Sequence, residues 1–356
     1  MDNVKLTELI RLLCSREIKV PDNLVEQQWH GVMHRSNILR SILRRRNVRI
    51  GAAAIATGIV FLAGALMFFS RQQGQLLPAE DIEFYALHTA PASETDFTGN
   101  TRLRVKGSEE IEVSATRANF DYSSGSIVSD ADTIARGASS APGQYNQLIV
   151  PCGKHASLKL NDGTVIHVNS HSRVVYPADF RVGNREIFLE GEAYFDVAHD
   201  ANRPLTVHTS RCKVCVLGTA FNVCAYPSAK SDDIALARGS VRVEQHNSRR
   251  TLSPGQLVSA GENSLSDVAN VDISQYTCWM NNYLICNNKQ LDEIFDRLHY
   301  IYGVDFVTPD GLQNIKISGK LDLRESLVDV LDILNYSIPL NFTLKGNTVN
   351  VTRRNV

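Results

Sequence analysis

Cysteine is scarce in this sequence. Seven cysteines among 356 residues are too few for a disulfide scaffold in a chain of this length, and an odd number cannot pair completely. Cys212 and Cys215 have CxxC spacing, but their segment has the pattern of a strand, in which residues three apart point to opposite faces. We therefore expect no zinc or redox site there. A disulfide between Cys215 and Cys224 is one alternative; buried, reduced cysteines are favoured.

The motifs of familiar enzyme classes are missing as well. The sequence has no Gly-x-Ser-x-Gly, no His-Glu-x-x-His and no phosphate-binding loop. His167, His171 and His199 lack the spacing of metal ligands, and we expect Glu190 and Glu192 to form a solvated rim. The sequence therefore predicts a protein that is not an enzyme and needs no metal or cofactor.

Long apolar runs are also rare, and one of them stands out. Ile50–Phe69 contains no charge, and a helix of that length rises about 30 Å, the thickness of the hydrocarbon core of a bilayer. Arg40, Arg44, Arg45, Arg46 and Arg49 flank its N-terminal side, whereas Arg71 stands nearly alone on the other. The positive-inside rule then predicts a single-pass protein of the bacterial inner membrane, with its N-terminal segment cytoplasmic and its C-terminal region periplasmic. A buried core helix and a signal peptide are the disfavoured alternatives.

The segment before the apolar run, residues 1–49, has the pattern of two short amphipathic helices. Such helices have too little core to bury their apolar faces on each other, so they need a partner. They either dock into a groove of a cytoplasmic protein or lie as a hairpin on the inner leaflet, and both interpretations stay open. The residues expected to bind a partner are Leu6, Leu9 and Leu13 on the first helix and Val25, Trp29 and Val32 on the second.

Beyond the apolar run the pattern changes to short alternating strands. Residues 70–147 are expected to form a linker and a first β region, and residues 148–272 a β domain. Asn161-Asp162-Gly163 is a strong hairpin signal. The segment RLRVKGSEEIEV recurs 55 residues later as SLKLNDGTVIHV, which indicates stacked hairpins and hence a β-sandwich or a short β-roll.

Residues 273–356 alternate strands with helices. Tyr283 to Cys286 has a strand pattern, and residues 291–300 and 324–334 have apolar faces at helical spacing. The pattern predicts two β-α-β units in a small α+β domain. The whole chain is therefore expected to be mainly β, with a short helical cytoplasmic segment, one transmembrane helix and this C-terminal domain.

Several blocks resemble the FecR-like transmembrane sigma-factor regulators. They occur in order over residues 148–256 as VPCGKHASLKLNDGTVIHVNSHSRVVYPADF, REIFLEGEAYFDVAHDANRPLTVHT, VLGTAFNVCAY and LSPGQ. ISGKLDLRESLVDVLDIL resembles the C-terminal domain of Bacteroidetes-type members, which is similar to the short N-terminal domains of secretins and TonB-dependent transducers. The resemblance implies an anti-sigma factor that binds an extracytoplasmic-function sigma factor and, in the periplasm, the signalling domain of a TonB-dependent outer-membrane transporter.

The resemblance also implies roles for single residues. Some FecR-like regulators cleave themselves between the residues equivalent to Gly218 and Thr219, which requires a strained turn that aims the threonine hydroxyl at the preceding carbonyl. Otherwise Gly191 and Gly218 are expected to permit tight turns. The rival function is a periplasmic carbohydrate-binding or structural anchor, which the low aromatic content of 7% does not favour.

Overall fold

The computed structural model of the chain describes residues 82–89, 92–105, 110–122, 126–129, 132–136, 145–181, 183–309, 312 and 315–354. The predicted transmembrane helix and both predicted cytoplasmic helices, with Leu6, Leu9, Leu13, Val25, Trp29 and Val32, lie outside these residues. Within the described ranges no helix has the length and apolar character to cross a membrane. All the described residues belong to one compact unit within residues 78–356.

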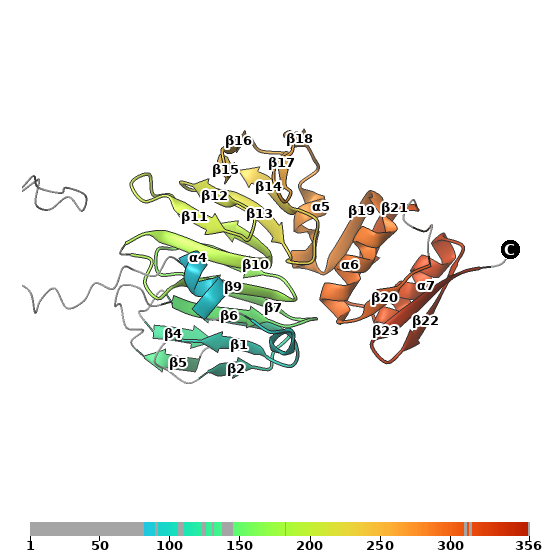
Figure 1. Cartoon of the computed structure of the whole chain (residues 1–356). Coiled ribbons are helices and arrows are strands. Elements are labelled where there is room, and N and C mark those ends of the chain that lie inside the picture. The colour runs from blue at the N-terminus through green and yellow to red at the C-terminus, as the bar shows by residue number, and fades with distance from the viewer. Residues whose placement is uncertain are drawn as a thin grey trace, which may run out of the picture. The chain divides into compact units, whose positions relative to one another are not determined.

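Residues 101–270 form a β body made of two sheets (Figure 1). In order across the first sheet lie β2 (Ile111–Val113), β1 (Thr101–Arg104), β6 (Tyr145–Val150), β9 (Ser172–Pro177), β10 (Arg185–Asp196), β11 (Leu205–His208), β12 (Lys213–Val216), β15 (Val241–Gln245) and β16 (Ser248–Leu252). The second contains β5 (Asp132–Arg136), β4 (Ser126–Ser129), β3 (Arg117–Asp121), β7 (His155–Lys159), β8 (Val165–Val168), β10 again, β13 (Ala220–Ala225), β14 (Asp232–Arg238), β17 (Gln256–Ala260) and β18 (Ala269–Asn270).

Strand β10 joins the two sheets because it passes from one to the other at Gly191. Its first half pairs with β9 and β11, and its second half pairs with β8 and β13. Gly191 has a φ of +105°, and a Cβ atom there would lie 2.2 Å from Ser172 Oγ. The expected tight turn at Gly191 is therefore wrong: the glycine lies inside a strand, at a close approach of two backbones.

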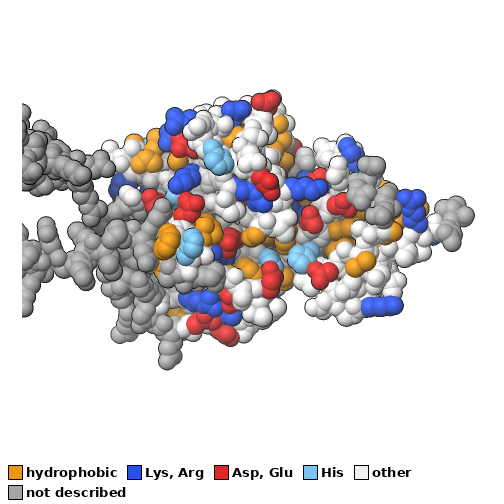
Figure 2. All heavy atoms as spheres, viewed as in Figure 1, with side chains coloured by type: hydrophobic (Ala, Val, Ile, Leu, Met, Phe, Trp, Pro, Cys, Tyr) orange, Lys and Arg blue, Asp and Glu red, His pale blue; other side chains and the backbone are white. Residues whose placement is uncertain are grey.

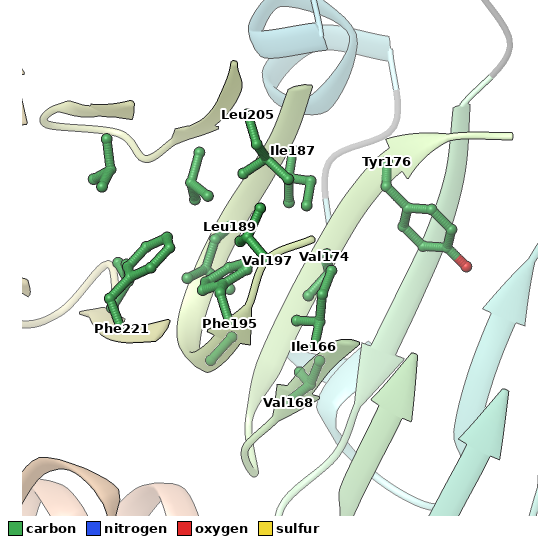
Figure 3. Close-up of a cluster of buried hydrophobic side chains, with 14 of the residues drawn as sticks. Ile166, Val168, Val174, Tyr176, Ile187, Leu189, Phe195, Val197, Leu205 and Phe221 are labelled. Carbon is green, nitrogen blue, oxygen red and sulfur yellow. The ribbon is translucent and has the colours of Figure 1, made fainter. Parts of the chain in front are cut away.

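One hydrophobic core lies between the sheets, and charged side chains of both signs are scattered over the face seen in Figure 2. Alternate residues of each strand point inward, as for Ile187 and Leu189 in the first half of β10 and Phe195 in the second (Figure 3). The rings of Phe195 and Phe221 stack at 5.0 Å between centroids. The mainly β prediction is confirmed, and both halves of the predicted repeat form hairpins, β1–β2 and β7–β8.

Short helical turns precede the β body. They are α4 (Ile82–Phe84), η1 (Tyr85–Thr89) and η2 (Glu94–Phe97). Ile82 and Ala86 pack with Val175 and Phe188 in a small cluster on the outer side of the first sheet. This cluster covers apolar side chains that the alternation of β9 and β10 would otherwise leave in water.

Residues 274–354 form the C-terminal module, which has a core of its own. Its elements are α5 (Ser274–Thr277), η3 (Cys278–Asn281), β19 (Tyr283–Gln290), α6 (Leu291–Tyr302), β20 (Asp305–Val307), β21 (Lys316–Asp322), α7 (Leu327–Ser337), β22 (Leu340–Lys345) and β23 (Thr348–Arg353). The predicted α+β alternation is confirmed. The strands divide into an antiparallel pair, β19–β21, and a sheet of order β20-β23-β22. Helix α7 begins at Leu327 rather than at the predicted Arg324, because Ser326 caps it by accepting a hydrogen bond from the Asp329 amide.

Candidate functional site: the joint between the β body and the C-terminal module

A buried carboxylate from the β body meets an arginine from the C-terminal module. Glu192, in the second half of β10, is 1% exposed. Its Oε2 accepts hydrogen bonds from Arg297 Nη1 of α6 at 2.5 Å and from Asn169 Nδ2 at 2.8 Å. Asn222 Nδ2 donates to Oε1 at 2.9 Å. The expectation of a solvated rim is therefore wrong for Glu192, because α6 covers it.

The same network extends to a tryptophan. Asn222 lies on β13, and its Oδ1 accepts a hydrogen bond from Trp279 Nε1 of η3 at 3.1 Å. The Trp279 ring stacks on His155 of β7 at 5.9 Å between centroids. Burial, and then the nearby Arg117 charge, lower the pKa of His155 to about 4, so this ring is neutral at pH 7. We define the joint as the contacts of Glu192, Asn169 and Asn222 with Arg297 and Trp279, together with the stack of Tyr226 on Tyr300.

Aromatic rings make the second part of the joint. Tyr226, the residue directly after β13, stacks on Tyr300 of α6 with 3.7 Å between centroids and 7° between planes. The Tyr226 hydroxyl donates to the Ser170 carbonyl at 2.8 Å, and the Tyr300 hydroxyl lies 2.5 Å from Ser228 Oγ. Both phenols have raised pKa values because they are buried. The polar end of each ring thus binds the β body while its face carries the stacking.

Three cavities border these contacts. One of about 390 Å³ is lined by residues of both parts, among them Arg117, Trp279 and Arg324. A second, of about 520 Å³, is lined by Asp296, His299 and other residues of α6 and β20 together with Ser228 and Lys230. The third, of about 190 Å³, lies beside Trp279 on β3, β7 and β8. Figure 2 shows histidine and acidic side chains next to one another on the surface between the β body and the C-terminal module.

One pair of side chains near the joint resembles a nucleophile with its base. Cys152 Sγ lies 3.3 Å from His171 Nδ1, and the His171 ring stacks on Phe97 at 4.2 Å. Burial raises the pKa of Cys152 to about 11 and lowers that of His171. An activated thiolate needs shifts of the opposite sign. The Cys152–His171 pair therefore lacks the electrostatics of an activated thiolate. In the described part of the chain no group of three or more His, Cys, Asp or Glu side chains could hold a metal ion.

The predicted cleavage point does not have the expected geometry. Thr219 is 1% exposed, and its hydroxyl donates to the Ser240 carbonyl at 2.9 Å, so its proton is engaged in a structural hydrogen bond. A Cβ atom on Gly218 would lie 2.6 Å from His199 Nδ1. Close packing against His199 therefore explains the glycine, and Gly218 is not among the described residues with positive φ.

The structure also distinguishes a Cys215–Cys224 disulfide from reduced cysteines. Cys215 lies on β12 of the first sheet and Cys224 on β13 of the second, and both are free thiols. The disulfide alternative is therefore wrong. Cys212 is buried at 4% exposure and Cys215 is half-buried, which agrees with side chains on opposite sides of their segment.

Sequence reasoning missed every donor to Glu192. One usable signal was present: Asn222 is an amide in the middle of β13, all of whose residues are buried. A buried amide needs a polar partner. Arg297 gave a weaker signal, since a charged residue on a helix is usually solvated.

Comparison with known proteins agrees with this two-part structure. The family model described as FecR protein matches residues 147–242, and the one described as FecR, C-terminal, matches residues 283–351. Two crystal structures of a candidate anti-sigma factor from Parabacteroides distasonis, at 1.65 and 2.50 Å resolution, are similar to this chain. Each has 27% sequence identity and a TM-score of 0.55 over 59% of this chain, and they are covered over 99% and 100% of their own lengths. No curated protein matched the sequence. Glu192 lies within the first matched region and Arg297 within the second.

Proposed function

We propose that this chain, which belongs to the FecR family, is a single-pass transmembrane anti-sigma factor that relays a signal from an outer-membrane TonB-dependent transporter to an extracytoplasmic-function sigma factor. The observation that carries the proposal is the order of the parts. Both family domains follow an uncharged run at residues 50–69 that has five arginines on its N-terminal side. This order supports a signal received in the periplasm and delivered in the cytoplasm.

The membrane topology has a direct test. A reporter enzyme that is active only in the periplasm, fused after residue 80, should be active. The same enzyme fused after residue 46 should be inactive. An inactive reporter after residue 80, in a fusion shown to be expressed, would refute the predicted membrane orientation and with it both the relay and the rival periplasmic anchor.

The sigma-factor contact is assigned to residues 1–46. A fragment of these residues, shown to be soluble and helical, should capture the sigma factor encoded nearby. Leu9→Asp places a charge on the apolar stripe and should abolish capture, because a charge cannot be buried in a groove without a partner. Glu8→Gln, on the polar side of the same helix, is the matched control and should bind as the parent does. The assignment would be refuted if the Leu9→Asp fragment still captured the sigma factor, or if the parent fragment did not capture it.

The transporter contact is assigned to the outer edge of β22. In the described part of the C-terminal module β22 pairs on one side only, with β23, as β19, β20 and β21 each do with their own partner. An unpaired edge can receive a strand from a partner. The alternatives are poorer. β21 carries Lys316 and Lys320 and has a register shift opposite it, and β20 is three residues long. Leu344 of β22 is 43% exposed, so an apolar side chain is already available at this edge.

A proline scan of β22 tests the assignment. The turn at Gly346-Asn347 and the hydrogen bond from the Arg354 amide to the Pro339 carbonyl place the amides of Thr343 and Lys345 toward β23 and that of Leu344 outward. Leu344→Pro should therefore abolish binding of the transporter's signalling domain with little loss of stability. Leu344→Thr keeps the amide and should retain binding. Equal binding by the proline variant and the parent would exclude this edge.

A further inference from the structure

We propose that the Glu192–Arg297 pair is a releasable latch, and that the two family domains separate at the joint as one step when the latch opens. The inference rests on the proposed function for its purpose, since a relay needs two states of the periplasmic part. Its structural content, that closure depends on this pair, is independent of any sigma factor or transporter.

The hydrogen-bond donors to the Glu192 carboxylate come from both parts of the structure. Two neutral donors, Asn169 and Asn222, come from the β body, and the one charged donor, Arg297, comes from α6. If Arg297 is lost while the joint stays closed, a carboxylate remains buried without a countercharge, which is strongly unfavourable. The closed state therefore requires the arginine, whereas the open state does not, because water then reaches the carboxylate.

Apolar packing around the latch is sparse. The apolar cluster between the two parts is small and contains Cys224, Tyr226 and Tyr300, with Ala229 packed against it. Cavities of about 390, 520 and 190 Å³ border the contacts. A permanent domain interface is large and apolar. Among the described residues the two parts are joined by one ion pair, the tryptophan hydrogen bond, two ring stacks, the Ser228–Tyr300 contact and hydrogen bonds from Arg117 Nη2 to the Met280 carbonyl and to Asn282 Oδ1. Most of these contacts are polar, and water can replace their hydrogen bonds when the two parts separate, so the joint is suited to opening.

The structure supplies a reporter of opening at a native residue. Cys224 of β13 is 7% exposed and packs with Tyr300 of α6, so removal of the C-terminal module uncovers it. Cys212 is the internal control: it is 4% exposed, belongs to the core of the β body, and accepts a hydrogen bond from Thr209 Oγ1. Reaction at Cys224 without reaction at Cys212 means that the joint opened while the β body stayed folded.

The experiment measures the rate of alkylation by N-ethylmaleimide at each cysteine of the purified full-length chain, by mass spectrometry of its peptides. Arg297→Met keeps the length of the side chain and removes its charge. We expect it to increase the rate at Cys224 on the order of a hundredfold, because access requires opening, with little change at Cys212. Trp279→Phe, which removes the Nε1–H donor and reduces the ring that stacks on His155, should give a smaller increase of about fivefold to tenfold at the same site.

A buried ion pair inside the β body is the matched control. Arg185 and Asp162 are joined at 3.1 Å, with side-chain exposures of 1% and 5%. Arg185→Met should expose Cys212 and Cys224 together, because it destabilises the body and not the joint. Unchanged Cys224 reactivity in both Arg297→Met and Trp279→Phe, or parallel increases at Cys212 in those variants, would overturn the latch. Neither result depends on sigma-factor capture, so failure of the latch and failure of the proposed function are distinguishable.

Discussion

Substitution of Gly191 by alanine tests how β10 connects the two sheets. The φ of +105° is unfavourable for any residue with a Cβ atom, at about 1–2 kcal/mol. The new Cβ would also lie 2.2 Å from Ser172 Oγ and 2.6 Å from Ser172 Cα. The second contact is with backbone, which a rotamer change cannot relieve, so overpacking adds about 1–3 kcal/mol. We expect Gly191→Ala to lower the free energy of unfolding by about 2–5 kcal/mol.

The assay is urea denaturation of the full-length chain, with unfolding monitored by circular dichroism. Gly255→Ala is the control for φ alone, since Gly255 has a φ of +82° and open space around its Cα; it should cost about 1–2 kcal/mol. Ser172→Gly in the Gly191→Ala background removes the side-chain contact and leaves the contact with Cα, so rescue should be partial. Equal losses for Gly191→Ala and Gly255→Ala would refute the close approach as the reason for the glycine.

Three further predictions concern the described residues. His155 has a pKa of about 4 in the folded chain, against an ordinary value of 6.5. Between these pH values only the unfolded chain binds the proton, so the free energy of unfolding should fall by on the order of 2–3 kcal/mol from pH 7 to pH 4. His155→Phe should make the free energy of unfolding depend less on pH over this range. Thr219→Ala removes the hydrogen bond to the carbonyl of the exposed Ser240 and should cost about 0.5–1.5 kcal/mol, while a denaturing gel should show the same single intact band as the parent. Phe195→Ala should lower the free energy of unfolding by about 3–5 kcal/mol, clearly more than Tyr194→Ala on the other face of β10.

Local patterns predicted the hairpins and the C-terminal elements well. Alternation and Asp162-Gly163 placed β7 and β8, whose residues pair from Ala156↔Val168 to Lys159↔Val165, because a hairpin is encoded by neighbouring residues. Residue spacing alone could not tell how the strands of the C-terminal module divide into two sheets. Gly191 was misassigned for a similar reason: a glycine that approaches another backbone and one that forms a turn give the same local signal.

The misassignment of Glu192 shows what the joint adds to the strand pattern. In the second half of β10, Ala193 and Phe195 are fully buried and point into the core, so Glu192, Tyr194 and Asp196 must point to the outer face of the second sheet. Asp196 is exposed and Tyr194 half-buried, as that face predicts. Only Glu192 departs from the pattern.

Glu192 is therefore buried by helix α6, which covers the outer face of the second sheet, and not by the core of the β body. The covering residue, Arg297, is 105 positions away in the chain, which local periodicity cannot detect. The same geometry explains why the latch can open at moderate cost. When α6 moves away, Glu192 returns to the solvent-facing side of a strand, where a carboxylate is hydrated, while the core residues beside it stay in place.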